Sequence, residues 1–192
     1  MVPLWQKLTD NADEMEIERM DLKSKIRNVP DFPKPGIGFK DITTLVKDAE
    51  AFQDSINQLA DYFGSKNVDV VVGIESRGFI FGAALAYKWK IGFVPVRKPG
   101  KLPAETYSET YALEYGTDTL EIHKDAISPG QRVLVIDDLL ATGGTLEATT
   151  HLVERCGGNV VGIACLIELT FLNGRKKLQG YDFHSLIQFD SE

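Results

Sequence analysis

The chain has 192 residues, of which 43% are hydrophobic and 26% charged, with a formal net charge of −7 and a pI near 5.0. This composition is typical of one folded domain with a hydrophobic core, and it excludes a disordered chain. The acidic balance argues against nucleic acid as a partner, and the strand-length apolar runs argue against a membrane span.

The first segment, residues 1 to about 27, predicts a helix that ends before Pro30. Residues 1–5 lack the basic and long apolar regions of a secretory signal, and Cys156 and Cys165 are too few for a disulfide framework. We therefore expect reduced cysteines and a cytoplasmic location. The prolines and glycines of residues 30–38 predict a loop.

The strongest helical pattern follows this loop, with Asp48 in place to cap the helix. Its apolar side chains are Phe52, Ile56, Leu59, Ala60 and Phe63. A strand over 68–74 then leads through a polar turn into an apolar helix over 79–89, and a short strand is predicted over 92–96.

Residues 97–124 are polar and interrupt this alternation of strand and helix. Their second half predicts a hairpin with arms at 110–115 and 119–123 and a turn at 116–118. A polar segment of this length inside a domain is usually functional, often as a lid.

Strand and helix then alternate to the end of the chain. Strands are predicted over 132–136, 159–167 and 183–187, and helices over 143–156 and 171–178. Apolar strands that alternate with helices indicate an α/β fold, with a mostly parallel central sheet flanked by helices. No linker divides the chain, so we expect residues 1–192 to form a single domain.

The main candidate site lies at the end of the strand over 132–136. Two carboxylates, Asp137 and Asp138, are followed by a loop rich in threonine and glycine that opens a helix. Ligands of such sheets bind where the strands end, and a helix N-terminus with small residues suits a phosphate. The acids can accept from sugar hydroxyls, so the residues suit a sugar phosphate. The proposed binding residues are Asp137, Asp138, Ala141, Thr142, Gly143, Gly144 and Thr145.

Other phosphate motifs fit this segment poorly. A P-loop requires a lysine before its final Ser or Thr, and a dinucleotide fingerprint requires G-x-G-x-x-G after a strand. The unbroken order of four apolar residues, two acids and a Thr/Gly loop resembles the phosphoribosyl-pyrophosphate (PRPP) signature of type I phosphoribosyltransferases. That resemblance implies the type I phosphoribosyltransferase fold, with a small N-terminal hood over about 26–45 and a mobile lid hairpin over about 97–120.

Two further segments match the same family. Glu75-Ser76-Arg77-Gly78 resembles its pyrophosphate loop, in which relatives hold a non-proline cis peptide; here the bond falls between Glu75 and Ser76. The basic run over 97–103 resembles the start of the lid. The resemblance implies that pyrophosphate is bound by Glu75, Ser76, Arg77, Lys98 and Lys101.

The base is indicated by similarity to the adenine-specific members of the family. The matching stretches are Pro30–Pro33 with Gly36–Ile42, Gly100–Pro103, Leu113–Gly116 and Ile167–Thr170. By this likeness adenine meets the hood at Gly38, Phe39 and Lys40, with Phe39 stacked on it and backbone groups reading its edge, and Ile136 contributes from the strand.

The resemblance also assigns catalytic roles. Glu114 is expected near N7 of the purine, where a carboxylate can move the N7/N9 proton, and Arg77 and Lys101 stabilise the leaving pyrophosphate. Tyr115 belongs to the lid. The expected reaction joins PRPP and adenine to give AMP and pyrophosphate, in a homodimer. Mg²⁺ is held mainly by PRPP, with Asp137 and Asp138 acting partly through water and no direct protein ligand.

Three alternatives stay open at this point. A related enzyme for a 6-oxopurine would turn over guanine or hypoxanthine, a non-catalytic sensor would bind PRPP without turnover, and an unrelated sugar-phosphate binder would release no pyrophosphate. The lid residues Ala104 to Thr110 have no clear counterpart in the family, and the three histidines lack metal-ligand spacing.

Overall fold

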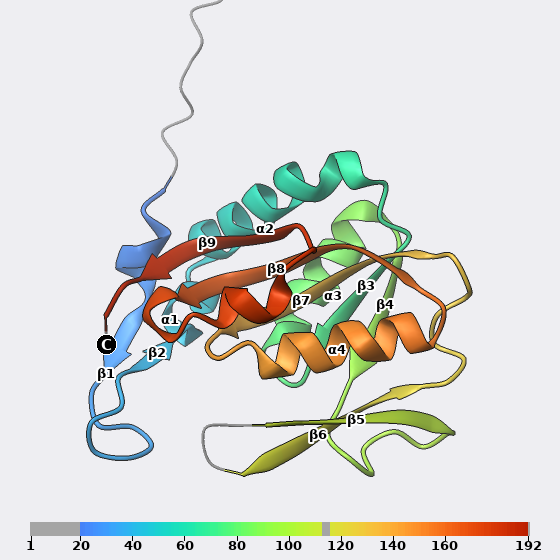
Figure 1. Ribbon diagram of the computed structural model, residues 1–192. Coiled ribbons are helices and arrows are strands. Elements are labelled where there is room, and N and C mark those ends of the chain that lie inside the picture. The colour runs from blue at the N-terminus through green and yellow to red at the C-terminus, as the bar shows by residue number, and fades with distance from the viewer. Residues whose placement is uncertain (1–19, 113–115, 192) are drawn as a thin grey trace, which may run out of the picture.

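The computed structural model describes residues 20–112 and 116–191. Its centre is a five-stranded sheet in the order β4-β3-β7-β8-β9, with every neighbouring pair parallel. The strands span β3 Val70–Ile74, β4 Gly92–Val96, β7 Arg132–Leu140, β8 Asn159–Leu169 and β9 Phe183–Phe189. The α/β fold with a parallel central sheet is therefore confirmed (Figure 1).

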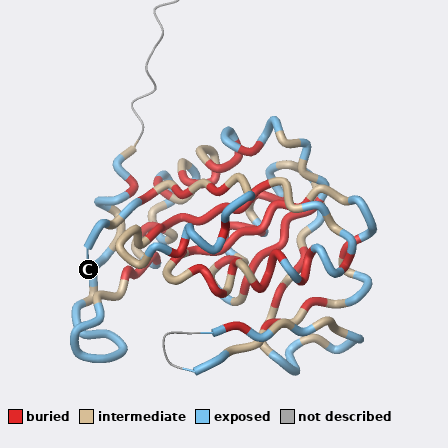
Figure 2. Tube along the Cα trace, viewed as in Figure 1, coloured by how far each residue is buried: buried red, intermediate tan, exposed pale blue. Residues whose placement is uncertain are grey.

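Helices cover both faces of this sheet because the strand side chains alternate. Val71 and Leu134 pack with helices α2 (Ala49–Phe63) and α3 (Gly78–Trp89) on one face. Val72 and Val135 pack with helix α4 (Gly144–Arg155) on the other. Figure 2 shows that burial is concentrated along the central strands. Two apolar faces on each strand explain the continuous apolar runs in the sequence.

Helix α2 begins where the sequence predicts. The Asp48 side chain accepts hydrogen bonds from the backbone N–H groups of Glu50 and Ala51, which satisfies two donors of the first turn. A short helix α1 (Thr43–Lys47) precedes it, and a 3-10 turn η3 (Gly64–Lys66) follows it.

The predicted N-terminal helix is wrong in its described part. From Met20 onward there is only a 3-10 turn, η2 (Leu22–Lys25), capped by the Asp21 carboxylate, and Ile26 is already extended. Strand β1 (Arg27–Val29) then pairs antiparallel with β2 (Phe39–Asp41). The chain is thus extended from Ile26 onward, where the predicted helix has its last turn, because the next residues pair with β2. The rest of the prediction lies outside the described residues.

The predicted hairpin forms, but both of its arms begin earlier than predicted, and residues 113–115 of the first predicted arm lie outside the described residues. Strand β5 (Thr106–Ala112) pairs antiparallel with β6 (Thr117–His123), so Thr117 and Asp118 are strand residues and not turn residues. The hairpin lies beside α4 and is separate from the central sheet (Figure 1). Tyr111, Leu120 and Ile122 belong to the α4-side core, which accounts for the extra length.

Two other boundaries differ from the sequence prediction. The 171–178 helix is replaced by two 3-10 turns, η4 (Thr170–Leu172) and η5 (Gly174–Leu178), because Asn173 between them is left-handed with φ 56°. Strand β7 continues to Leu140, so both acids lie inside the strand and not beyond it. Among the described residues no helix is long and apolar enough to cross a membrane.

Candidate functional site

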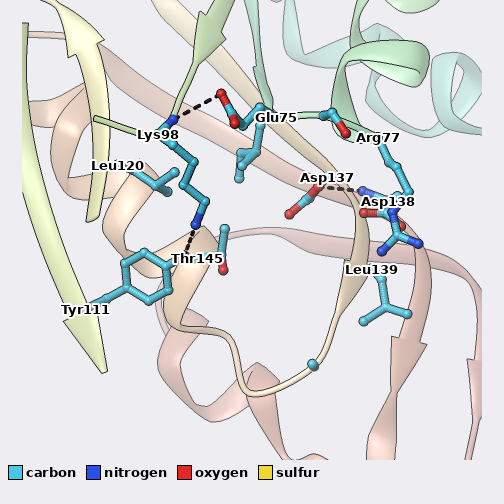
Figure 3. A pocket seen from close by; sticks show the side chains of 12 residues that line it. Glu75, Arg77, Lys98, Tyr111, Leu120, Asp137, Asp138, Leu139 and Thr145 are labelled. Atoms are coloured by element: carbon cyan, nitrogen blue, oxygen red, sulfur yellow. Dashed lines mark hydrogen bonds and ion pairs between the residues drawn. The ribbon is translucent and has the colours of Figure 1, made fainter. Parts of the chain in front are cut away.

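The polar turn that follows β3 meets the polar residues at the end of β7 at one edge of the sheet. The two strands are neighbours, with Gly73 opposite Ile136, so the segments that follow them emerge side by side. Between them is a cavity of about 260 Å³. Its lining, drawn in Figure 3, is Ile74, Glu75, Ser76, Arg77, Lys98, Tyr111, Leu120, Asp137, Asp138, Leu139, Ala141 and Thr145.

The two acids of the cavity are buried side by side. Asp137 and Asp138 are 8% and 5% exposed, and Asp137 Oδ1 accepts from the backbone N–H of Asp138 at 2.9 Å. Burial raises the pKa of both carboxyls, and the neighbouring charge of Asp138 raises the pKa of Asp137 further. The cavity therefore favours any ligand that brings hydrogen-bond donors or a cation to these oxygens.

Arg77 joins two parts of the site. Its Nη2 lies 2.9 Å from Asp138 Oδ2, and its guanidinium carbon lies 5.1 Å from the centroid of the Phe39 ring. The arginine therefore neutralises one buried acid, Asp138 (Figure 3), while it covers the aromatic ring of Phe39. An incoming anion can take over the same guanidinium.

The turn at Glu75 is held by its side chain. Glu75 Oε2 accepts from Arg97 Nε at 2.9 Å and from the backbone N–H of Lys98 at 3.1 Å. The peptide bond between Glu75 and Ser76 is cis, as predicted. These contacts tie the turn after β3 to the basic run after β4 and bring Lys98 to the cavity.

The loop after the acids makes a second small cavity of about 140 Å³ that shares Leu139, Ala141 and Thr145 with the first. Gly143 has φ +84°, and a Cβ built on it would lie 2.5 Å from the Gly174 carbonyl oxygen. A larger residue would therefore displace the loop from η5. The loop presents small residues at the first turn of α4, which is a suitable place for a phosphate.

Phe39 sits in the small β1–β2 sheet, beside a cavity of about 300 Å³ lined by Val29, Phe32, Phe39 and Asp41. Phe32 meets Phe39 edge to face, with the ring centroids 5.1 Å apart. Hydrogen bonds from Thr43 and Arg27 lower the pKa of Asp41 to about 2, which keeps this corner charged and fixed. The cavity wall is mostly aromatic and aliphatic, as a planar base requires.

Several predicted residues do not line the cavity between β3 and β7. The Lys40 side chain is buried, donates to Asn28 Oδ1 at 3.0 Å and lies 4.5 Å from the Phe189 ring centroid, so only its backbone is available to a base. Ile136 is fully buried in the α2–α3 side core, and Leu139 lines the cavity instead. Lys101 is exposed and is not among the lining residues. Glu114 and Tyr115 lie outside the described residues.

Four residues that line the cavity were missed by the sequence reading: Tyr111, Leu120, Leu139 and Ile74. The alternation of the hairpin contained a signal for the first two, because one face of each arm must point toward the main domain. Leu139 was missed because the acids were placed after the strand. Within 20–112 and 116–191, no three His, Cys, Asp or Glu side chains are grouped as a metal site.

Comparison with known proteins adds the family context. Residues 41–187 match the phosphoribosyl transferase domain. The adenine phosphoribosyltransferase of Clostridium perfringens is 61% identical over 171 residues, which cover 89% of this chain and 99% of that protein.

Solved structures agree with this match. The adenine phosphoribosyltransferase of Thermoanaerobacter pseudethanolicus is 62% identical, covers 88% of this chain and 98% of its own, and has a TM-score of 0.85. The enzyme of Saccharomyces cerevisiae, solved with adenine and an imino-altritol bisphosphate, is 41% identical with a TM-score of 0.81 and covers 86% of this chain and 96% of its own.

Proposed function

Because this chain belongs to the phosphoribosyltransferase family, we propose that it joins adenine to PRPP and releases AMP and pyrophosphate. In this reaction the bond between C1′ and the pyrophosphate oxygen breaks, a bond from N9 of adenine to C1′ forms, and the N9 proton is lost. The observation that carries the proposal is the pair of buried acids facing Arg77 across one cavity, beside an aromatic hood.

PRPP would bind across this cavity. Asp137 and Asp138 would accept from the ribose hydroxyls, and the loop Ala141, Thr142, Gly143, Gly144 and Thr145 would hold the 5′-phosphate. The raised pKa of both acids supports this, since bound hydroxyl donors relieve a carboxylate that burial leaves poorly solvated.

Pyrophosphate would occupy the end of the cavity next to Glu75 and Ser76. Arg77 would leave Asp138 for the more highly charged anion, and Lys98 would contribute its ammonium from the opposite wall. Lys101 would have to move with its loop to reach the same group. These cations lower the energy of the negative charge that grows on the leaving group.

Adenine would stack on Phe39 within the hood, with the backbone of Gly38 and Lys40 reading its edge and Ile136 supporting the site from the core. Glu114 would accept the proton that N9 loses. Backbone recognition of the 6-amino group disfavours a 6-oxopurine, because its carbonyl would face another acceptor.

We also propose that the reaction uses Mg²⁺. The residues present fit this ion, since Asp137 and Asp138 are hard oxygen donors whose charged forms are disfavoured by burial, and a bound cation would offset that cost. The ion would be held mainly by PRPP, with the two acids reaching it partly through water. When bound, it neutralises the pyrophosphate.

A homodimer in the cytoplasm completes the proposal. The dimer rests on the family resemblance, and the location is supported by Cys156 and Cys165, which are both free and buried. Light scattering of the purified chain tests the dimer, which predicts twice the 21.3 kDa mass of one chain.

The decisive experiment is a pyrophosphate-release assay with PRPP, Mg²⁺ and one base at a time: adenine, hypoxanthine, guanine or uracil. We expect turnover with adenine alone, and its loss in Glu114→Ala and in the Asp137→Ala/Asp138→Ala double variant. Turnover with an oxopurine would overturn the proposed base site. PRPP binding without turnover would indicate a sensor.

A further inference from the structure

Lys98 is held by two residues of the hairpin. Its Nζ forms an ion pair with Asp118 Oδ2, lies 3.4 Å from Tyr111 Oη and is 5.8 Å from the centroid of the Tyr111 ring. Tyr111 and Asp118 are directly opposite one another on β5 and β6, so both side chains point to the same face of the hairpin. The ammonium is therefore paired with Asp118 and also contacts Tyr111, and the Tyr111 contact is drawn in Figure 3.

The backbone of Lys98 is fixed independently of this ion pair. Its N–H donates to Glu75 Oε2 at 3.1 Å, which anchors the residue to the turn after β3. The side chain is 36% exposed and lines the cavity. A flexible side chain on a fixed backbone can exchange one anionic partner for another without moving the loop.

Asp118 is also fixed. Its Oδ1 accepts from the backbone N–H of Thr119 at 2.8 Å, and its neighbour Tyr111 packs against the first residue of α4. A Cβ built on Gly144 would lie 2.9 Å from Tyr111 Cδ2. The Asp118 carboxylate is therefore held next to Lys98 by a hydrogen bond that does not depend on the lysine.

We propose that Asp118 is a positioning residue that holds the Lys98 side chain and competes with pyrophosphate for its ammonium. The inference rests on the proposed function, in which Lys98 binds pyrophosphate. Burial opposes the charge on Lys98, but Asp118 and Tyr111 raise its pKa, so the lysine is charged in both states. PRPP must break the ion pair to bind, and the carboxylate reclaims the lysine as pyrophosphate departs.

A structural role for Asp118 predicts the opposite result. If the pair only stiffened the hairpin, its loss would loosen the site and weaken PRPP binding. If the pair competes with the ligand, its loss strengthens binding. The sign of the change in KM therefore separates the two roles.

The test is Asp118→Asn, which keeps the shape and removes the charge. We expect the KM for PRPP and the inhibition constant of pyrophosphate each to fall about two- to fivefold, the range for a partly exposed ion pair. The Asp118→Glu variant should restore values near those of the wild type. An unchanged or higher KM for PRPP in Asp118→Asn would overturn the proposal.

The matched control is Glu105→Gln in the same hairpin. Glu105 forms an ion pair with Lys124 at 3.0 Å, and its side chain is 84% exposed and lines a different surface cavity. The variant therefore removes one negative charge, as Asp118→Asn does, but at a distance from Lys98. We expect no change in either constant. An equal fall in this control would attribute the effect to net charge and overturn the proposal.

A double-variant cycle with Lys98→Met tests whether Asp118 acts on the ligand through Lys98. In that background Asp118→Asn should have no effect, and an undiminished effect would mean that Asp118 acts on the ligand without Lys98. If Lys98→Met alone leaves the KM for PRPP unchanged, the assignment of Lys98 fails while the overall reaction stands. Absence of AMP from the wild type would instead remove the proposed function.

Discussion

Gly78 lies directly against Asp137: a Cβ built on the glycine would come within 2.9 Å of Asp137 Oδ1 and of the Ile136 carbonyl oxygen. The first residue of α3 and the first acid of the cavity, which lies in β7, are therefore in contact. This contact sets the distance between the turn after β3 and the two acids.

Gly78→Ala should separate the two halves of the site. Because the added methyl meets backbone atoms, the strain cannot be relieved by a side-chain rotation, and we expect a loss of about 1–3 kcal/mol in unfolding free energy and a raised KM for PRPP. Urea denaturation and steady-state kinetics measure the two effects. Gly64→Ala is the control, because it has helical backbone angles and nothing within 4 Å of its added Cβ. Equal behaviour of the two variants would contradict the argument.

Asp137→Asn should stabilise the ligand-free protein while it reduces activity. The raised pKa of Asp137 means that the folded protein keeps a proton that the unfolded chain has lost, so wild-type stability falls as pH rises above the ordinary carboxyl range. The asparagine amide does not titrate, so it removes this loss of stability, and its oxygen can still accept the hydrogen bond from the Asp138 N–H. We expect a gain on the order of 1 kcal/mol at neutral pH and a flatter pH dependence. Thermal melts between pH 4 and 8 measure both, and a less stable variant at pH 7 would refute this.

Much of the fold follows from periodicity, and the errors have physical causes. The parallel strands and helices α2, α3 and α4 were predicted because each buries a regular apolar pattern. The limits of β7 and β5 were not, because Asp137, Asp138 and Thr106 are polar residues that gain their extended conformation from neighbouring strands. Propensity does not contain this information.

The site was predicted in part for the same reason. The motif residues Glu75, Arg77, Asp137 and Asp138 were expected at strand ends, and they line one cavity because the ends of adjacent parallel strands meet. The ion pair of Lys98 with Asp118 joins residues 20 positions apart, and it depends on a hairpin register that the sequence does not specify. The burial of the Lys40 side chain likewise depends on Phe189, which comes from the opposite end of the chain.

Phe39→Ala should weaken the binding of adenine selectively. Loss of a stacking partner removes about 1–3 kcal/mol, so we expect the KM for adenine to rise about tenfold or more while the KM for PRPP changes little. Steady-state kinetics with each substrate varied in turn separates the two constants. Tyr87→Ala is the control, because Tyr87 is 88% exposed on α3. A change confined to the KM for PRPP would show that Phe39 acts through Arg77 and not on the base.

Glu168→Gln should destabilise the protein at neutral pH. This buried carboxylate accepts from Arg175 Nε and Nη2 at 2.9 and 2.5 Å and from Ser185 at 2.9 Å, and these hydrogen bonds lower its pKa. The stabilisation is therefore present above the ordinary carboxyl pKa and is lost as pH falls through the lowered value.

The expected loss is about 1–3 kcal/mol at pH 7, and it should shrink below pH 4. Urea denaturation at several pH values measures it. Glu105→Gln, which removes an exposed partner of Lys124, should change the unfolding free energy little at any pH. A pH-independent difference between Glu168→Gln and the wild type would mean that shape, and not charge, stabilises this region.

The continuation of β7 to Leu140 has a consequence for hydrogen exchange. Asp137 and Leu139 are paired with Cys165 and Ile167 of the adjoining strand, so the backbone that carries the acids belongs to the central ladder. The amides that donate within that ladder can exchange with solvent only when it opens, whereas the β5–β6 hairpin is a separate two-stranded sheet that can open independently. The acidic half of the site should thus show the slow exchange of global unfolding, and the half that carries Asp118 should exchange through smaller, more frequent openings.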